Sequence, residues 1–100
     1  MNVQMARFTV KPNSISEFEQ AAKGLFAAVQ RSRPKGIIGY TLSRLSDGVT
    51  YLGLLELENG VNNPLPELPE GGEFLESLAN WTTEVPARDQ LSVIGSYRTV

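Results

Sequence analysis

The chain has 100 residues, a formal net charge of −2 and a hydrophobic content of 41%. This length suits one domain, which buries roughly 60–68% of the surface of its unfolded chain. Cysteine and histidine are both missing. Their absence excludes disulfides, thiolate metal sites and histidine-ligated haem, and the acidic balance argues against a nucleic-acid partner.

The first half of the chain begins with a strand pattern and continues with a helix pattern. Apolar and polar residues alternate over 3–10, and Pro12 ends this predicted strand. An apolar stripe at helical spacing covers 15–29 and predicts the first helix. Ser14 and Glu17 have the spacing of a capping box at its start.

Two further alternating runs, 37–45 and 49–58, predict a hairpin around Asp47 and Gly48. Asp-Gly favours a two-residue type I′ turn, in which both central residues have positive φ. Counting outward from that turn predicts the cross-strand partners. The face expected under the helices has the pairs Arg44–Tyr51, Leu42–Gly53 and Tyr40–Leu55. The other face has the pairs Leu45–Thr50, Ser43–Leu52, Thr41–Leu54 and Gly39–Glu56.

The remainder of the chain is an irregular segment, a helix and a strand. Residues 59–72 contain three prolines and end in Gly-Gly, so we expect no regular helix there. Such a loop could be a lid over a pocket, an arm that grips a partner, or a slack connection. A second helix is predicted over 73–84 and a last strand over 91–100.

The predicted order β-α-β-β-α-β is that of a single ferredoxin-like α+β sandwich over residues 1–100. It has a four-stranded antiparallel sheet with both helices on one face. The other face mixes leucines with threonine, serine and glutamate, which is typical of a surface covered by a second subunit.

The start of the chain resembles no signal peptide, because a strand pattern begins at once. No apolar run approaches the ~18 residues that span a membrane. We therefore expect a cytoplasmic protein with no membrane partner. We also expect no metal and no cofactor, since no acidic ligand loop is present.

Three segments, 5–12, 36–44 and 51–56, are similar to the antibiotic biosynthesis monooxygenase-like family of the dimeric α/β-barrel superfamily. The resemblance implies a homodimer whose two sheets face each other as a barrel. It also implies a pocket between sheet and helices, where some members oxidise phenols or quinols without a cofactor and others degrade haem.

Cofactor-free oxygenation needs a dry cavity and hydrogen-bond donors for the charge that develops on the substrate. Tyr40, Arg44, Tyr51 and Gln4 could supply these donors, and Arg44 beside Tyr51 is the best polar pair by register. The alternative is that the tyrosine rings fill the core and Arg44 is solvated. The residues that could line a substrate site with Gln4 are Phe18, Phe26, Asn80 and Trp81. For Trp81, which lies on an apolar helix stripe, core packing is the alternative.

The residues expected in a sheet-to-sheet dimer interface are Arg7, Thr41, Ser43, Leu52, Leu54 and Glu56. Glu56 could be a general base, or it could form an ion pair with Arg7, which we favour. Two functions therefore remain open. One is a monooxygenase-like enzyme that acts on a small apolar aromatic. The other is a non-catalytic dimeric module that binds a small ligand, or a partner protein through 59–72.

Overall fold

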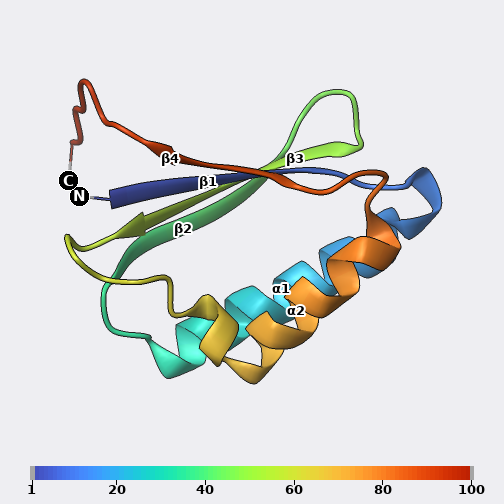
Figure 1. Cartoon of the computed structure of the whole chain (residues 1–100), viewed down its shortest axis with the longest axis horizontal. Helices are drawn as coiled ribbons and strands as arrows, with labels where there is room; N and C mark the ends of the chain where they lie inside the picture. Colours follow the sequence, from blue (N-terminus) through green and yellow to red (C-terminus); the bar gives the residue numbers. More distant parts are fainter. Residues whose placement is uncertain (1, 100) are drawn as a thin grey trace.

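The computed structural model describes residues 2–99. Its elements are β1 (Asn2–Thr9), α1 (Ile15–Ser32), β2 (Ile37–Arg44), β3 (Thr50–Leu57), α2 (Pro69–Trp81) and β4 (Ala87–Leu91). A 3₁₀ turn precedes each helix, at Pro12–Ser14 and Leu65–Glu67. The strands form one antiparallel sheet in the order β2-β3-β1-β4, and both helices lie on one side of it (Figure 1). The predicted ferredoxin-like sandwich is confirmed.

The β2–β3 hairpin has the predicted register but a different turn. The confirmed pairs are Gly39–Glu56, Tyr40–Leu55, Thr41–Leu54, Leu42–Gly53, Ser43–Leu52 and Arg44–Tyr51. The type I′ prediction is wrong, because Gly48 has φ +80° while Asp47 is not in the left-handed region. The Asp47 carboxylate accepts hydrogen bonds from the Val49 and Thr50 N–H groups, at 3.0 and 2.8 Å, and from the Thr50 hydroxyl, at 2.5 Å. These bonds lower the pKa of Asp47, and the bond from the Thr50 hydroxyl has the largest effect. They replace a tight two-residue turn with a wider loop that begins after the hydrogen bond from Leu45 N–H to Thr50 O.

The start of α1 differs from the capping-box prediction, which is wrong. The Ser14 side chain caps nothing, and the Ser14 N–H instead donates to Lys11 O within the 3₁₀ turn. The Glu17 carboxylate accepts from the Trp81 indole at 3.3 Å. The helix therefore begins as a continuation of the preceding turn. Phe18, Ala22 and Leu25 of its predicted apolar stripe are buried, and the other members of the stripe are half-buried.

The segment 59–72 is irregular only in its first part. A 3₁₀ turn forms at Leu65–Glu67, and α2 begins at Pro69 instead of residue 73, so the prediction for the second part is wrong. Pro69 is accommodated in the first turn of α2, where its missing N–H has no intrahelical partner to lose. Gly71 is required by contact, because a Cβ at this position would lie 1.9 Å from the Leu65 carbonyl oxygen.

The last strand is also placed differently from the prediction. β4 is Ala87–Leu91, and residues 92–99 are not in the sheet. β4 pairs with β1 from Arg7 opposite Ala87 to Val3 opposite Leu91. This pairing ends one residue from Asn2, the first residue of β1, so the alternating run beyond Leu91 extends past the described part of β1. Position 100 of the predicted strand lies outside the described residues.

The core lies between the sheet and the two helices. Phe18 is 0% exposed, and its ring lies 5.8, 4.7 and 5.6 Å from the rings of Phe8, Tyr51 and Phe74. Within residues 2–99, no helix covers the opposite face of the sheet, and Leu52 and Leu54 are half-buried there. Among residues 2–99, no helix combines the length and the apolar character needed to cross a bilayer.

Candidate functional site

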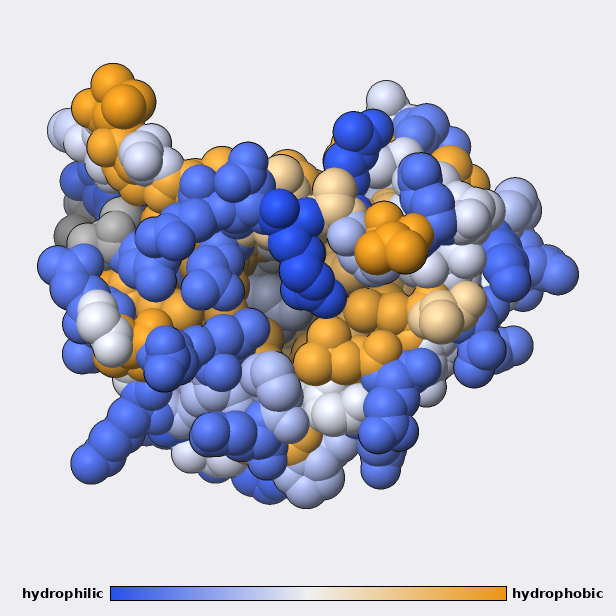
Figure 2. Space-filling model, in the orientation of Figure 1, coloured by the Kyte–Doolittle hydropathy of each residue, from blue (hydrophilic) through white to orange (hydrophobic). Residues whose placement is uncertain are grey.

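A cavity of about 420 Å³ lies between the helix-facing side of the sheet and the helices. Figure 2 shows a hollow between β4 and α2 in which apolar surface is exposed next to strongly polar residues. Its apolar walls come from three different elements of the fold. Phe8 belongs to β1, Leu25 to α1 and Phe74 to α2. This arrangement is typical of a small-molecule site.

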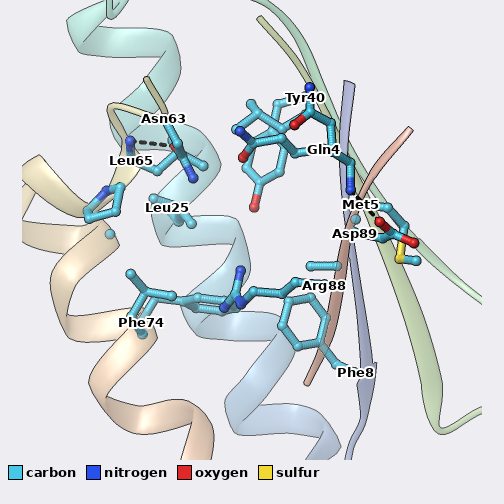
Figure 3. Close-up of a pocket in the computed structure, with 17 residues that line it drawn as sticks. Gln4, Met5, Phe8, Leu25, Tyr40, Asn63, Leu65, Phe74, Arg88 and Asp89 are labelled. Atoms are coloured by element: carbon cyan, nitrogen blue, oxygen red, sulfur yellow. Dashed lines mark hydrogen bonds between the residues drawn. The ribbon is translucent and has the colours of Figure 1, made fainter. Parts of the chain in front are cut away.

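Six polar residues line the cavity: Gln4 of β1, Tyr40 of β2, Asn63 of the β3–α2 connection, and Arg88, Asp89 and Gln90 of β4. The Tyr40 hydroxyl points into the cavity, and Arg88 extends from β4 toward Phe74 (Figure 3). The Asn63 side-chain oxygen accepts a hydrogen bond from Leu65 N–H at 2.9 Å. Its amide NH₂ therefore remains as a donor.

Tyr40 is held as a neutral phenol. Burial raises its pKa, and the nearby positive charge of Arg88 lowers it by less. The hydroxyl is therefore protonated at neutral pH and can donate a hydrogen bond. The ring of Phe26 stacks against that of Tyr40, so α1 supports the phenol from behind.

Arg88 gives the cavity a positive charge that is not neutralised within residues 2–99. The ion pairs in this part of the chain join Arg31 to Glu70, Arg44 to Glu19 and Arg98 to Glu56. Asp89, the neighbour of Arg88, points to the opposite side of the sheet (Figure 3), where its carboxylate accepts from the Gln90 N–H at 2.8 Å. The polar groups that reach the cavity are thus mainly donors, which suits an anionic oxygen on the ligand.

Arg44 and Tyr51 are brought together, as the register predicted, but in a different place from Tyr40 and Gln4. They line a smaller hollow between α1 and the hairpin. The Tyr51 hydroxyl donates to the Glu19 carboxylate, and Arg44 Nη1 lies 3.3 Å from the same oxygen. Burial is the largest cause that raises the pKa of Tyr51, and the hydrogen bond to Glu19 and its negative charge raise it further. This cluster fastens α1 to the sheet.

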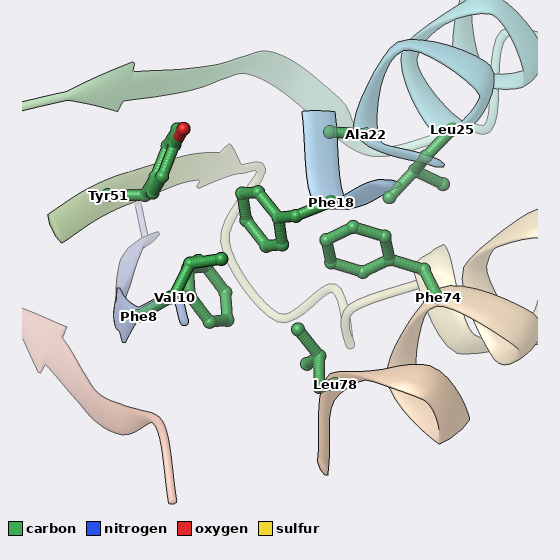
Figure 4. Close-up of a cluster of buried hydrophobic side chains, with 8 residues drawn as sticks. All are labelled: Phe8, Val10, Phe18, Ala22, Leu25, Tyr51, Phe74 and Leu78. Atoms are coloured by element: carbon green, nitrogen blue, oxygen red, sulfur yellow. The ribbon is translucent and has the colours of Figure 1, made fainter. Parts of the chain in front are cut away.

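The remaining predicted substrate-site residues lie outside the cavity. Phe18 is at the centre of the core, where Tyr51 packs against it with its hydroxyl pointing away (Figure 4). Trp81 meets Phe18 edge-on, with ring centroids 6.1 Å apart. Asn80 is exposed, and its backbone carbonyl accepts from Lys11 Nζ at 3.2 Å. Phe26 lines the smaller hollow.

Sequence reasoning missed Arg88 and Asn63. Arg88 precedes the residues predicted as the last strand, so its face could not be assigned. The register opposite Ala6 places it on the helix side. Asn63 precedes Pro64, a signal for a turn, but only the fold of the connection brings its amide to the cavity.

The predicted ion pair between Arg7 and Glu56 is wrong. Arg7 lies opposite Leu52, whereas Glu56 lies opposite Val3, near the other end of β1. Glu56 instead accepts two hydrogen bonds from Arg98 Nη2, at 2.9 and 2.8 Å. Within residues 2–99, no three acidic side chains gather in a way that could hold a metal ion.

No family model matches the chain, and none of the curated proteins matches it in sequence. Solved structures do match across nearly its whole length. A putative antibiotic biosynthesis monooxygenase from Nitrosomonas europaea has a TM-score of 0.81 at 14% identity, covering 95% of this chain and 100% of its own. SnoaB, a cofactor-independent oxygenase from Streptomyces nogalater, has a TM-score of 0.73 at 18% identity, covering 95% and 94%. A protein of unknown function from Nitrosomonas europaea has a TM-score of 0.78 at 7% identity, covering 99% and 94%. The predicted resemblance to antibiotic biosynthesis monooxygenases is confirmed at the level of the fold.

Proposed function

We propose that this chain is a cofactor-independent monooxygenase that oxidises a small apolar phenol or quinol in the cavity between sheet and helices. The observation that carries the proposal is the convergence of Tyr40, Gln4, Asn63 and the unpaired Arg88 on an apolar space of about 420 Å³. The fold shared with a cofactor-independent oxygenase supports it.

The reaction needs an electron-rich anion and dioxygen. An anthrone serves as an example: its CH₂ carbon becomes a carbonyl, one oxygen atom enters the substrate, and the other leaves as water with the two hydrogens. Arg88 favours the substrate anion by its charge, and the proton passes to solvent. The Tyr40 hydroxyl donates to the charged oxygen as electron density moves to dioxygen.

The apolar side chains of the cavity have a different role from its polar groups. Phe8, Leu25 and Phe74 hold the aromatic ring and keep water from it, which strengthens each polar contact in the cavity. The amides of Gln4 and Asn63 fix the orientation of the ring by hydrogen bonds to its oxygen substituents.

We also propose that two copies pair through the open face of the sheet, which has half-buried Leu52 and Leu54 at its centre. Thr41, Ser43, Arg7 and Glu56 lie around these leucines on the same face. Burying the two leucines against a second copy would remove their exposed surface from water.

A second candidate is a module that binds an anionic aromatic without turning it over. The donor-rich lining favours it, because Tyr40, Arg88 and the two amides bind an anion without any catalytic group. The two candidates share a site and differ in whether dioxygen is consumed.

The experiment is oxygen uptake with a panel of anthrones and quinols, using the wild type, Arg88→Gln, Tyr40→Phe and Tyr51→Phe. We expect uptake by the wild type and a loss of about tenfold or more in kcat/KM for Arg88→Gln, which removes the charge. Tyr51→Phe is the matched control, since its hydroxyl is bonded to Glu19 outside the cavity. If the protein binds compounds of the panel but consumes no oxygen with any of them, the proposed enzymatic activity is overturned and the binding module is supported.

A further inference from the structure

A second hollow of about 460 Å³ lies on the side of α2 that faces the segment leading to β4, next to the cavity. We call it the α2 groove; it lies between α2 and the segment that leads to β4, and Leu75, Ala79 and Val85 line it. Leu75 and Arg88 line both the cavity and the groove. These two side chains therefore form the boundary that the two spaces share.

The groove offers mainly apolar surface to a ligand. Val85 is 89% exposed and Leu75 is 37% exposed. Apart from Arg88 at the junction, polar side chains along the groove are bonded within the protein. The Thr82 hydroxyl donates to Leu78 O at 2.8 Å, and the Glu84 carboxylate accepts from the Thr9 hydroxyl at 3.3 Å. An apolar occupant would therefore displace water without breaking polar contacts.

We propose that the cavity and the α2 groove form one elongated ligand site for a hydroxylated aromatic with an apolar chain. The ring occupies the cavity, and the chain passes between Leu75 and Arg88 into the groove. This inference rests on the proposed function only in taking the cavity as the ligand site; it does not require turnover.

The two ends of the site have opposite character, and this sets the orientation of the ligand. Tyr40, Gln4 and Asn63 lie in the cavity and not in the groove, so the hydroxyl end binds there. Arg88 stands at the junction, where its charge can reach the ring oxygen while its methylene stem borders the chain.

The test is calorimetric binding of 1-naphthol and of 1-naphthols with linear 4-alkyl chains of increasing length. We expect the wild type to bind about fourfold more tightly for each methylene buried in the groove. Ala79→Trp fills the groove without touching the cavity and should remove this dependence on chain length, while 1-naphthol binds as before. Val85→Asp, at an exposed position, should weaken the dependence by placing a charge beside the chain.

Glu76→Trp is the matched control, because Glu76 is exposed on the same helix and lines neither space. It should keep the wild-type dependence. The inference is overturned if 1-naphthol binds and the chain adds nothing, or if Ala79→Trp and Glu76→Trp behave alike. The proposed enzyme is judged separately by oxygen uptake, so either proposal can fail while the other stands.

Discussion

The rings of Phe26 and Tyr40 are stacked, with centroids 4.5 Å apart and planes inclined by 15°. Phe26 comes from α1 and lines the smaller hollow, whereas Tyr40 comes from β2 and extends its hydroxyl into the cavity. The ring of Phe26 therefore limits how far the phenol of Tyr40 can tilt. This contact makes Phe26 a positioning residue for the cavity without touching the ligand.

Removing the stacked ring should weaken ligand binding only through Tyr40. We expect Phe26→Ala to raise the Kd of 1-naphthol by about fivefold, an effect of the size expected for an aromatic pair. In Tyr40→Phe, which lacks the hydroxyl, the further change Phe26→Ala should add little. Calorimetric titration of the four proteins of this double-mutant cycle measures the coupling. Fully additive losses would mean that Phe26 acts by another route.

Gly71 and Gly72 provide a matched pair in the first turns of α2. A Cβ at Gly71 would lie 1.9 Å from the Leu65 carbonyl oxygen, whereas at Gly72 the nearest atom is Pro66 O at 3.6 Å. Gly71→Ala should therefore lower the free energy of unfolding by about 1–3 kcal/mol. Gly72→Ala should raise it by about 0.5–1 kcal/mol, because alanine favours a helix. Urea titrations of both variants check this, and equal midpoints would contradict it.

The sequence predicted the elements whose signals are local. The hairpin register followed from alternation, and the same alternation placed Tyr40 and Gln4 on the helix side, where the cavity lies. The start of α2 could not be predicted, because glycine normally argues against a helix, whereas at Gly71 it is needed for the close approach of the Leu65 carbonyl. Arg88 was missed because alternation continues beyond Leu91, although the pairing of β4 with β1 ends at Leu91.

Stability at high pH should depend on Tyr40. Burial raises its pKa above the usual 10.0. Below the pKa that Tyr40 has in the unfolded chain, its hydroxyl is protonated in both the folded and the unfolded state, so its full contribution to stability is present. As the pH rises toward the folded-state pKa, only the unfolded state loses the proton, and stability falls. Tyr40→Phe should therefore flatten the decline in urea midpoint above pH ~10. Tyr97→Phe, at a site 87% exposed, is the control and should decline like the wild type.

Self-association should depend on Glu56. Its carboxylate is held by two hydrogen bonds from Arg98 beside the proposed interface, at 2.9 and 2.8 Å. Glu56→Ala leaves Arg98 unpaired at a surface that loses water on pairing, so the dimer Kd should rise by about tenfold or more. Analytical ultracentrifugation measures it. Glu70→Ala removes the exposed pair with Arg31 on the helix side and should leave the Kd unchanged. If both variants associate like the wild type, Glu56 has no part in the interface.

The position of β1 in the sheet has a consequence for biosynthesis. β1 precedes the other strands in the sequence, yet it pairs with β3 on one side and with β4, the last strand, on the other. Chains emerge from the ribosome N-terminus first. One edge of β1 therefore has no hydrogen-bonding partner strand until Ala87–Leu91 has been made. Gln4 of β1 and Arg88 of β4 can line the same cavity only after β4 has emerged and joined β1. Ligand binding to arrested nascent chains would therefore report when the last strand joins the sheet.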